Sequence, residues 1–154
     1  MTGALQERVL AYLRAHHVMT LATQGSAGPW AAAVFYASDG FTLYFLSAPA
    51  TRHATELAAH ARVAATIQDE CADWAAIKGI QLEGEARELH GEQAERARAI
   101  YAEKFPVLGN ADQAPAPIAA AFARIRWYRI VPDRLYFVDN SVRFGHRDQV
   151  IPAD

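Results

Sequence analysis

The sequence has very little cysteine: Cys71 is the single one among 154 residues. One thiol forms neither an intrachain disulfide nor a cysteine-based metal cluster within the chain, and it suits a reducing compartment. Long apolar runs are also lacking, and the first residues, MTGALQERVLAYLRAHHV, carry charge throughout. A signal peptide and a membrane-spanning segment are therefore disfavoured, and we expect a cytoplasmic protein without a membrane partner.

The sequence also lacks a large excess of acidic or basic residues. Fifteen Lys and Arg residues stand against 17 Asp and Glu, so the net charge of -2 creates no overall field that would attract nucleic acid. The motifs GxSxG, GxGxxG after a strand and the Walker loop do not occur, and the six histidines have neither HxxxH nor HExxH spacing. We expect no metal site. Glu83 and Glu85, on a strand that faces solvent, give little support to a two-carboxylate hydrolase.

Apolar residues are abundant, at 52% of the sequence, with 10% aromatic and 21% charged. A chain of this length buries enough apolar surface to fold alone, and we assign residues 1–154 to a single domain. The apolar share is high for a small protein with much surface to cover. We therefore expect part of this surface to be buried between the two subunits of a homodimer.

Short strands separated by turn signals make up most of the pattern. The first three strands are expected to form an antiparallel meander. Later in the chain, residues 106–117 are expected to form an irregular connection or a lid, and residues 132–134 a turn between two strands. So many short strands usually close into a barrel, which removes exposed edges. The predicted strands are 18–24, 30–37, 41–47, 62–68, 77–89, 124–131, 135–140 and 142–146, and the predicted helices are 4–16, 50–61, 91–105 and about 117–123.

The segment from Ser47 to His53 carries the clearest chemical signal, because a strand ends there and a helix begins. A helix N-terminus presents unpaired N–H groups, to which Ser47 and Thr51 add hydroxyls and Arg52 adds a fork of donors. These groups suit a phosphate. The same residues also describe an ordinary capped helix with a solvent-exposed arginine, and the segment alone leaves both interpretations open.

Two further segments are unusual. Residues 31–33 are successive alanines in a predicted strand, which either let a flat ligand approach the backbone or face a crowded interior. Residues 139–147 bring aromatic and basic side chains together near the end of the chain. They either approach a ligand or a neighbouring subunit, or form a polar turn.

The order and spacing of these segments resemble the pyridoxamine 5'-phosphate oxidase-like family of FMN-binding split barrels, from about residue 17 to 147. The chain is most similar to a small group of uncharacterised bacterial members, through TRHA at 51–54, IKGIQLEGEA at 77–86 and FVDNSVRFG at 137–145. The resemblance implies a mainly β fold, an antiparallel split β-barrel of the Greek-key, FMN-binding type with peripheral α-helices. It also implies a homodimer with FMN at the interface.

The resemblance further implies which residues contact FMN. The family usually has a lysine beside the arginine of the phosphate site, and His53 replaces it here, so phosphate affinity is expected either to be weaker or to depend on pH. Lys78 either supplies the missing charge or is a surface lysine. The basic residues that hold the vitamin B6 substrate have no secure counterpart, so this activity does not follow. The expected cofactor-binding residues are Ala33, Val34, Phe35 and Tyr36 beside the ring, and Ser47, Thr51, Arg52, His53, Lys78 and Gly79 beside the phosphate.

We expect a flavin-dependent oxidoreductase in which FMN carries the hydride, acting on an unidentified small-molecule substrate. No side chain is assigned as acid or base. Two alternatives stay open: a haem-binding or haem-degrading split barrel, and a flavin-binding protein without turnover of its own.

Overall fold

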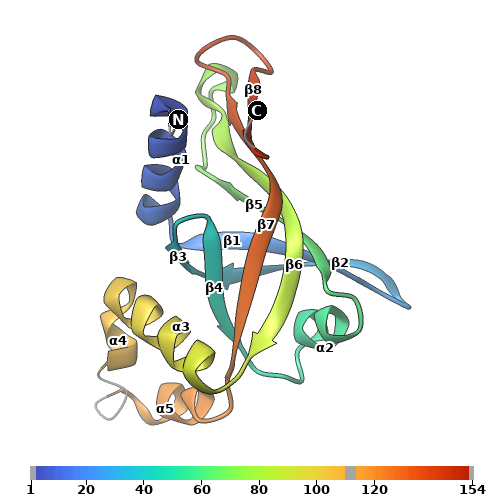
Figure 1. Ribbon diagram of the computed structural model, residues 1–154, viewed down its shortest axis with the longest axis vertical. Coiled ribbons are helices and arrows are strands. Elements are labelled where there is room, and N and C mark those ends of the chain that lie inside the picture. Colours follow the sequence, from blue (N-terminus) through green and yellow to red (C-terminus); the bar gives the residue numbers. More distant parts are fainter. Residues whose placement is uncertain (1–2, 110–113, 153–154) are drawn as a thin grey trace.

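One antiparallel sheet of eight strands curls into an open half-barrel (Figure 1). The computed structural model describes residues 3–109 and 114–152. The strands follow the order β2-β1-β5-β6-β7-β4-β3, and β8 pairs with β7. The strands are β1 (Val18–Gly25), β2 (Gly28–Phe35), β3 (Ala37–Asp39), β4 (Thr42–Ser47), β5 (Arg62–Gln68), β6 (Lys78–Leu89), β7 (Arg126–Asp139) and β8 (Arg147–Ile151), and the helices are α1 (Ala4–Ala15), α2 (Arg52–Ala59), α3 (Gly91–Lys104), α4 (Pro106–Gly109) and α5 (Ala116–Phe122), with a short 3-10 turn at Trp74–Ala76.

Buried and exposed residues alternate along the strands, so one face of the sheet is buried. In β5, Val63, Ala65 and Ile67 are buried and the residues between them are exposed. β6 alternates in the same way over residues 80–86, with Glu83 half-buried among the outward-facing residues. The inner faces of the strands and the buried side of α1 enclose the main hydrophobic core. The expected mainly β fold with peripheral helices is confirmed.

Helix α3 covers the opposite face of β4 and β7 (Figure 1). Its buried residues Ala97 and Tyr101 pack in a second core with Trp127, and the Tyr101 and Trp127 rings meet edge to face at 5.3 Å. These contacts form the apolar stripe of the helix. No helix within residues 3–109 and 114–152 is both long enough and apolar enough to cross a membrane.

The predicted three-stranded meander is wrong, because its second strand does not pair with its third. Among the described strands, β2 pairs with β1 alone, whereas β4 pairs with β3 and β7. The chain leaves β2 at Tyr36, whose side chain is 0% exposed and whose hydroxyl donates to the carbonyl of Leu13 at 2.8 Å. Burial of this residue separates β2 from β3, and the alternating pattern of the sequence did not reveal the break.

The predicted turn at 132–134 is also wrong, because β7 runs through it and pairs with β6 on both sides. The register shifts where Gly84 lies opposite Pro132, and Asp133 is the extra residue of a β-bulge. A bulge tolerates proline and frees its extra residue from pairing. Here the Asp133 carboxylate accepts a hydrogen bond from Arg62 at 2.8 Å.

The last part of the chain also differs from the prediction. The strand predicted at 142–146 is a turn, in which Gly145 has φ +77° and donates its N–H to the side chain of Asn140 at 3.0 Å. The last strand, β8, follows this turn. The segment 106–117, expected to be irregular, begins with the short helix α4, and residues 110–113 lie outside the described residues. The short helix predicted around 117–123 is confirmed as α5.

Gly84→Ala is expected to destabilise the fold at the bulge. An added Cβ would lie 2.2 Å from the carbonyl oxygen of Val131, a backbone atom that cannot move without breaking the pairing of β6 and β7. We expect the free energy of unfolding to fall by about 2–4 kcal/mol in urea denaturation. Glu85→Ala, on the solvent side of the same strand, is the control and should change it by less than about 0.5 kcal/mol. Equal stability of the two variants would contradict the assigned register.

Candidate functional site

The connection from β4 to α2 gathers three polar side chains. Ser47 ends β4, Thr51 caps α2 and His53 lies in the first turn of the helix. Ser47 Oγ is 2.9 Å from Thr51 Oγ1 and 2.8 Å from His53 Nε2, and Thr51 Oγ1 is 3.3 Å from the same ring nitrogen. These three residues are termed the polar cluster. The structure therefore brings together three of the residues that the sequence predicted around a phosphate.

Local chemistry explains why the helix starts here. Thr51 has extended backbone angles and its Oγ1 accepts a hydrogen bond from the N–H of Ala54 at 3.3 Å, which is the usual role of an N-cap residue. The other N–H groups of the first turn have no partner within the helix. These N–H groups are donors suited to an anion. The Ser47 and Thr51 hydroxyls donate to the carbonyl of Ala48, at 3.1 and 3.0 Å.

His53 enters this cluster as a neutral ring. Burial lowers the pKa of His53, because it disfavours the charged imidazolium. A neutral imidazole carries a proton on one nitrogen, so it exchanges hydrogen bonds with the two hydroxyls but adds no charge. The positive charge at the start of α2 therefore comes from Arg52.

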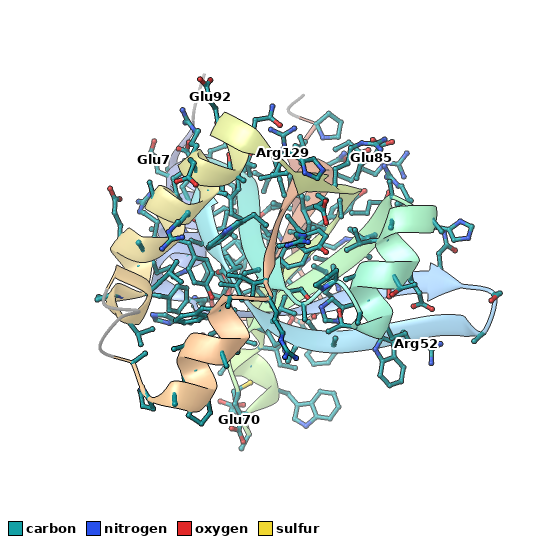
Figure 2. The ribbon with its side chains drawn as sticks, turned by 90° about the horizontal axis from the view of Figure 1, so that it is seen from below. Glu7, Arg52, Glu70, Glu85, Glu92 and Arg129 are labelled. Carbon is teal, nitrogen blue, oxygen red and sulfur yellow. The ribbon has the colours of Figure 1, made fainter. Side chains whose placement is uncertain are left out.

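The Arg52 side chain lies where α2 meets the β1–β2 hairpin (Figure 2). Its Nε donates to Glu56 Oε2 at 3.2 Å, and its guanidinium carbon lies 4.4 Å from the centre of the Trp30 ring. Within the described parts of the chain, Nη1 and Nη2 donate to no other group. Arg52 and Glu56 line an open cleft of about 580 Å³ together with residues 25–27 of the hairpin. Arg52 thus keeps two donors available to a ligand.

Glu56 and Trp30, which hold the Arg52 side chain, were not predicted from the sequence. The spacing of Arg52 and Glu56, four residues apart on a helix, was a signal that could have revealed their ion pair. The contact between Arg52 and Trp30 joins a helix to a strand 22 positions earlier in the chain, and no local pattern indicates it.

The strand predicted to border a flat ligand is the edge strand β2. Ala33 and Phe35 are exposed, Val34 is half-buried, and Phe35 meets the Phe105 ring at 5.6 Å. Tyr36 differs from these three because its side chain is fully buried in the core. The structure therefore presents Ala33 and Phe35 at the surface and withdraws the side chain of Tyr36 from it.

Lys78 and Gly79 lie far from the polar cluster within one chain. Ser47 is opposite the first residue of the 14-residue strand β7 and Lys78 is opposite its last, a separation of roughly 40 Å along the strand. Gly79 also has a packing reason to be glycine, since an added Cβ would lie 2.6 Å from the carbonyl oxygen of Ile67. One chain alone does not assemble these residues into a single site with Ser47.

Comparison with known proteins identifies the family. Residues 5–139 match the family described as pyridoxamine 5'-phosphate oxidase. The chain belongs to this family. It is 35% identical over 138 residues to the UPF0306 protein YhbP of Escherichia coli, a match that covers 88% of this chain and 86% of that protein. Both the family and the small bacterial subgroup inferred from the sequence motifs are confirmed.

Solved structures share the fold of the chain at low sequence identity. A haem-binding protein from Mycobacterium smegmatis gives a TM-score of 0.72 at 21% identity, covering 95% of this chain and 56% of that one. HutZ, the haem storage protein of Vibrio cholerae, gives 0.68 at 16% identity, covering 85% of this chain and 92% of that one. These similarities confirm that the chain has the split-barrel fold. Haem binding and haem storage are described for the two compared proteins and not for this chain.

Acidification is expected to destabilise the wild type more than a His53→Gln variant, whose side chain stays neutral. The pKa of His53 in the folded protein lies below its value in the unfolded chain, about 6.5, so the unfolded chain binds the proton first as the pH falls. The stabilising contribution of neutral His53 is full above that value and is lost progressively as the pH falls below it and through the lower pKa of the folded protein. Urea unfolding between about pH 5 and 8 measures the difference.

The matched control for this comparison is His90→Gln, because the His90 side chain is 77% exposed. Its pH profile should follow that of the wild type. If the His53→Gln profile also follows the wild type, His53 is not held in its neutral form by the fold.

Proposed function

We propose that this protein binds FMN, with the phosphate at the start of α2, and acts as a flavin-dependent oxidoreductase on a small-molecule substrate. Two observations carry the proposal: the polar cluster lies at the start of α2, and Arg52, the first residue of that helix, has two unpaired Nη donors. Membership of the pyridoxamine 5'-phosphate oxidase family supports flavin as the cofactor.

The residues present fit a phosphate group. The Ser47 and Thr51 hydroxyls can reorient to donate, the neutral ring of His53 can supply one N–H, and the Arg52 fork matches two phosphate oxygens. A phosphate dianion would also be favoured by the partial positive charge of the helix N-terminus. Since His53 is neutral, the charge of Arg52 is expected to contribute most to phosphate affinity.

FMN, when bound, supplies hydride transfer, and the protein supplies binding and orientation. On β2, the small side chain of Ala33 leaves room for a flat ring to approach the backbone, and the exposed Phe35 offers an aromatic edge beside it. No side chain near the polar cluster is assigned as an acid or a base. We therefore propose only that the substrate is a small molecule that the flavin reduces or oxidises.

A second candidate function is haem binding, favoured by the two haem proteins among the structural neighbours. Most imidazoles are already engaged: His16 contacts Asp69, His90 contacts Glu88 and His146 contacts Asp148. Among the described residues, the rings of His17 and His60 make no hydrogen bond, and they are the available iron ligands. Titration with haemin, with and without these two histidines, tests this alternative.

We further propose that the protein is a homodimer. The outer sheet face carries small and apolar exposed side chains on three adjacent strands, with Ala22 directly opposite both Ala31 and Ala64. Such a flat surface suits a symmetric contact with a second copy. A second subunit would also offer a route for Lys78 and Gly79 to approach a cofactor held by the partner. The outer sheet face is defined by Val18, Ala31, Ala33, Phe35, Ala64 and Thr66.

Arg52→Ala should weaken FMN much more than riboflavin, because riboflavin has the same ring but no phosphate. Loss of a charge-assisted contact of about 1.5–3 kcal/mol corresponds to a roughly 10- to 160-fold increase in the Kd for FMN. Quenching of flavin fluorescence measures both ligands. Arg96→Ala is the matched control, since Arg96 also pairs with a carboxylate, Asp39 at 2.7 Å, but lies on α3. An equal loss of both ligands in Arg52→Ala would place Arg52 away from the phosphate.

Light scattering should show a dimer for the wild type at micromolar concentration and a monomer for Ala64→Arg. A long charged side chain at Ala64 would project from the outer sheet face and prevent close contact between two copies. Ala99→Arg, an equal change at an exposed position of α3, should remain dimeric. A monomeric wild type, or a dimeric Ala64→Arg variant, would contradict an interface on this face.

A further inference from the structure

We propose that Trp30 and Glu56 are positioning residues that hold the Arg52 guanidinium ready for the phosphate of FMN. The inference rests on the proposed function, because it concerns the same site. It extends that function by explaining why a long surface side chain would be directed to one place. Neither residue needs to touch the cofactor for this role.

Trp30 provides a flat support for the guanidinium. Its side chain is 43% exposed on the edge strand β2, where a tryptophan gains little from burial in the core. The guanidinium carbon of Arg52 lies 4.4 Å from the ring centre, within the range of a cation–π contact. Arginine stacks on aromatic faces while its edges stay free for hydrogen bonds, so this contact fixes the plane of the group without using its donors.

Glu56 fixes the rotation of the guanidinium within that plane. One carboxylate oxygen, Oε2, accepts from Arg52 Nε at 3.2 Å, and the other, Oε1, accepts from the Thr23 hydroxyl at 2.9 Å. The Glu56 side chain is only 10% exposed. It also fills the space beside Gly25, where an added Cβ would lie 2.5 Å from Oε2. Glu56 is therefore anchored to β1 and cannot simply follow the movements of Arg52.

Together these contacts occupy one face and the Nε of Arg52 and leave the edge formed by Nη1 and Nη2. That edge is the fork that binds two oxygens of a phosphate. A free arginine side chain loses much rotamer freedom when it binds a ligand, and a held one has already lost it on folding. The two supports should thus raise the affinity for the phosphate and leave the affinity for the flavin ring unchanged.

The first test compares Trp30→Leu with Trp30→Phe, measuring the Kd of FMN and of riboflavin by fluorescence quenching. Trp30→Leu removes the aromatic face and should raise the Kd of FMN by about 3- to 20-fold, while that of riboflavin stays within about twofold. Trp30→Phe keeps an aromatic face and should restore most of the FMN affinity. Trp74→Leu, which replaces a 70% exposed tryptophan outside the site, should change neither value.

The second test compares Glu56→Ala with Glu56→Gln. Both remove the negative charge, but only glutamine keeps an oxygen acceptor for Arg52 Nε or the Thr23 hydroxyl. The difference between the variants therefore reports the hydrogen bonds rather than the charge. Glu56→Ala should bind FMN about 3- to 20-fold more weakly than Glu56→Gln, with equal riboflavin affinity.

The outcomes separate this inference from the proposed function. A wild type that binds no flavin contradicts the proposed function itself. A wild type that prefers FMN to riboflavin, with the same preference in Trp30→Leu and in both Glu56 variants, contradicts only the positioning role. An equal loss of FMN and riboflavin in Trp30→Leu also overturns it, because the indole would then support the ring site or the fold rather than the phosphate fork.

Discussion

The sheet is built on the unbroken pairing of β6 with β7. These two strands run side by side from Lys78 to Leu89 and pass through a bulge without separating. β5 joins one side of the pair, and β4 and β8 join the other, so the curl of the half-barrel follows from this central ribbon. The bulge requires Gly84, because a backbone carbonyl of β7 occupies the space of a side chain.

The same ribbon sets the position of the site. β4 pairs with the start of β7, so Ser47 lies at the end of the sheet where α2 begins. Two hydroxyls and a neutral imidazole then meet at the N-terminus of α2. Arg52, the first residue of that helix, is held beside the β1–β2 hairpin by Glu56 and Trp30. Glu56 pairs with Arg52 and lowers the net charge of the arrangement.

The sequence predicted single elements well where local chemistry determines them. α1, α2 and α3, and strands β5 and β6, lie close to their predicted bounds because apolar periodicity and capping are local properties. Ser47, Thr51 and His53 were predicted together because they lie within seven residues. The errors concern distant partners. Burial of Tyr36 against α1, the Asp133 bulge opposite Gly84 and the contact of Arg52 with Trp30 each depend on residues far along the chain, which no local pattern reports.

Native mass spectrometry of the wild-type protein, incubated with equal amounts of FMN and haemin and then desalted, distinguishes the two proposed cofactors. If the protein binds FMN at a site shared by two subunits, a dimer that carries one FMN for each subunit should form. A species that carries haem in place of FMN, or a monomer that carries neither, would show that the proposed FMN site is wrong.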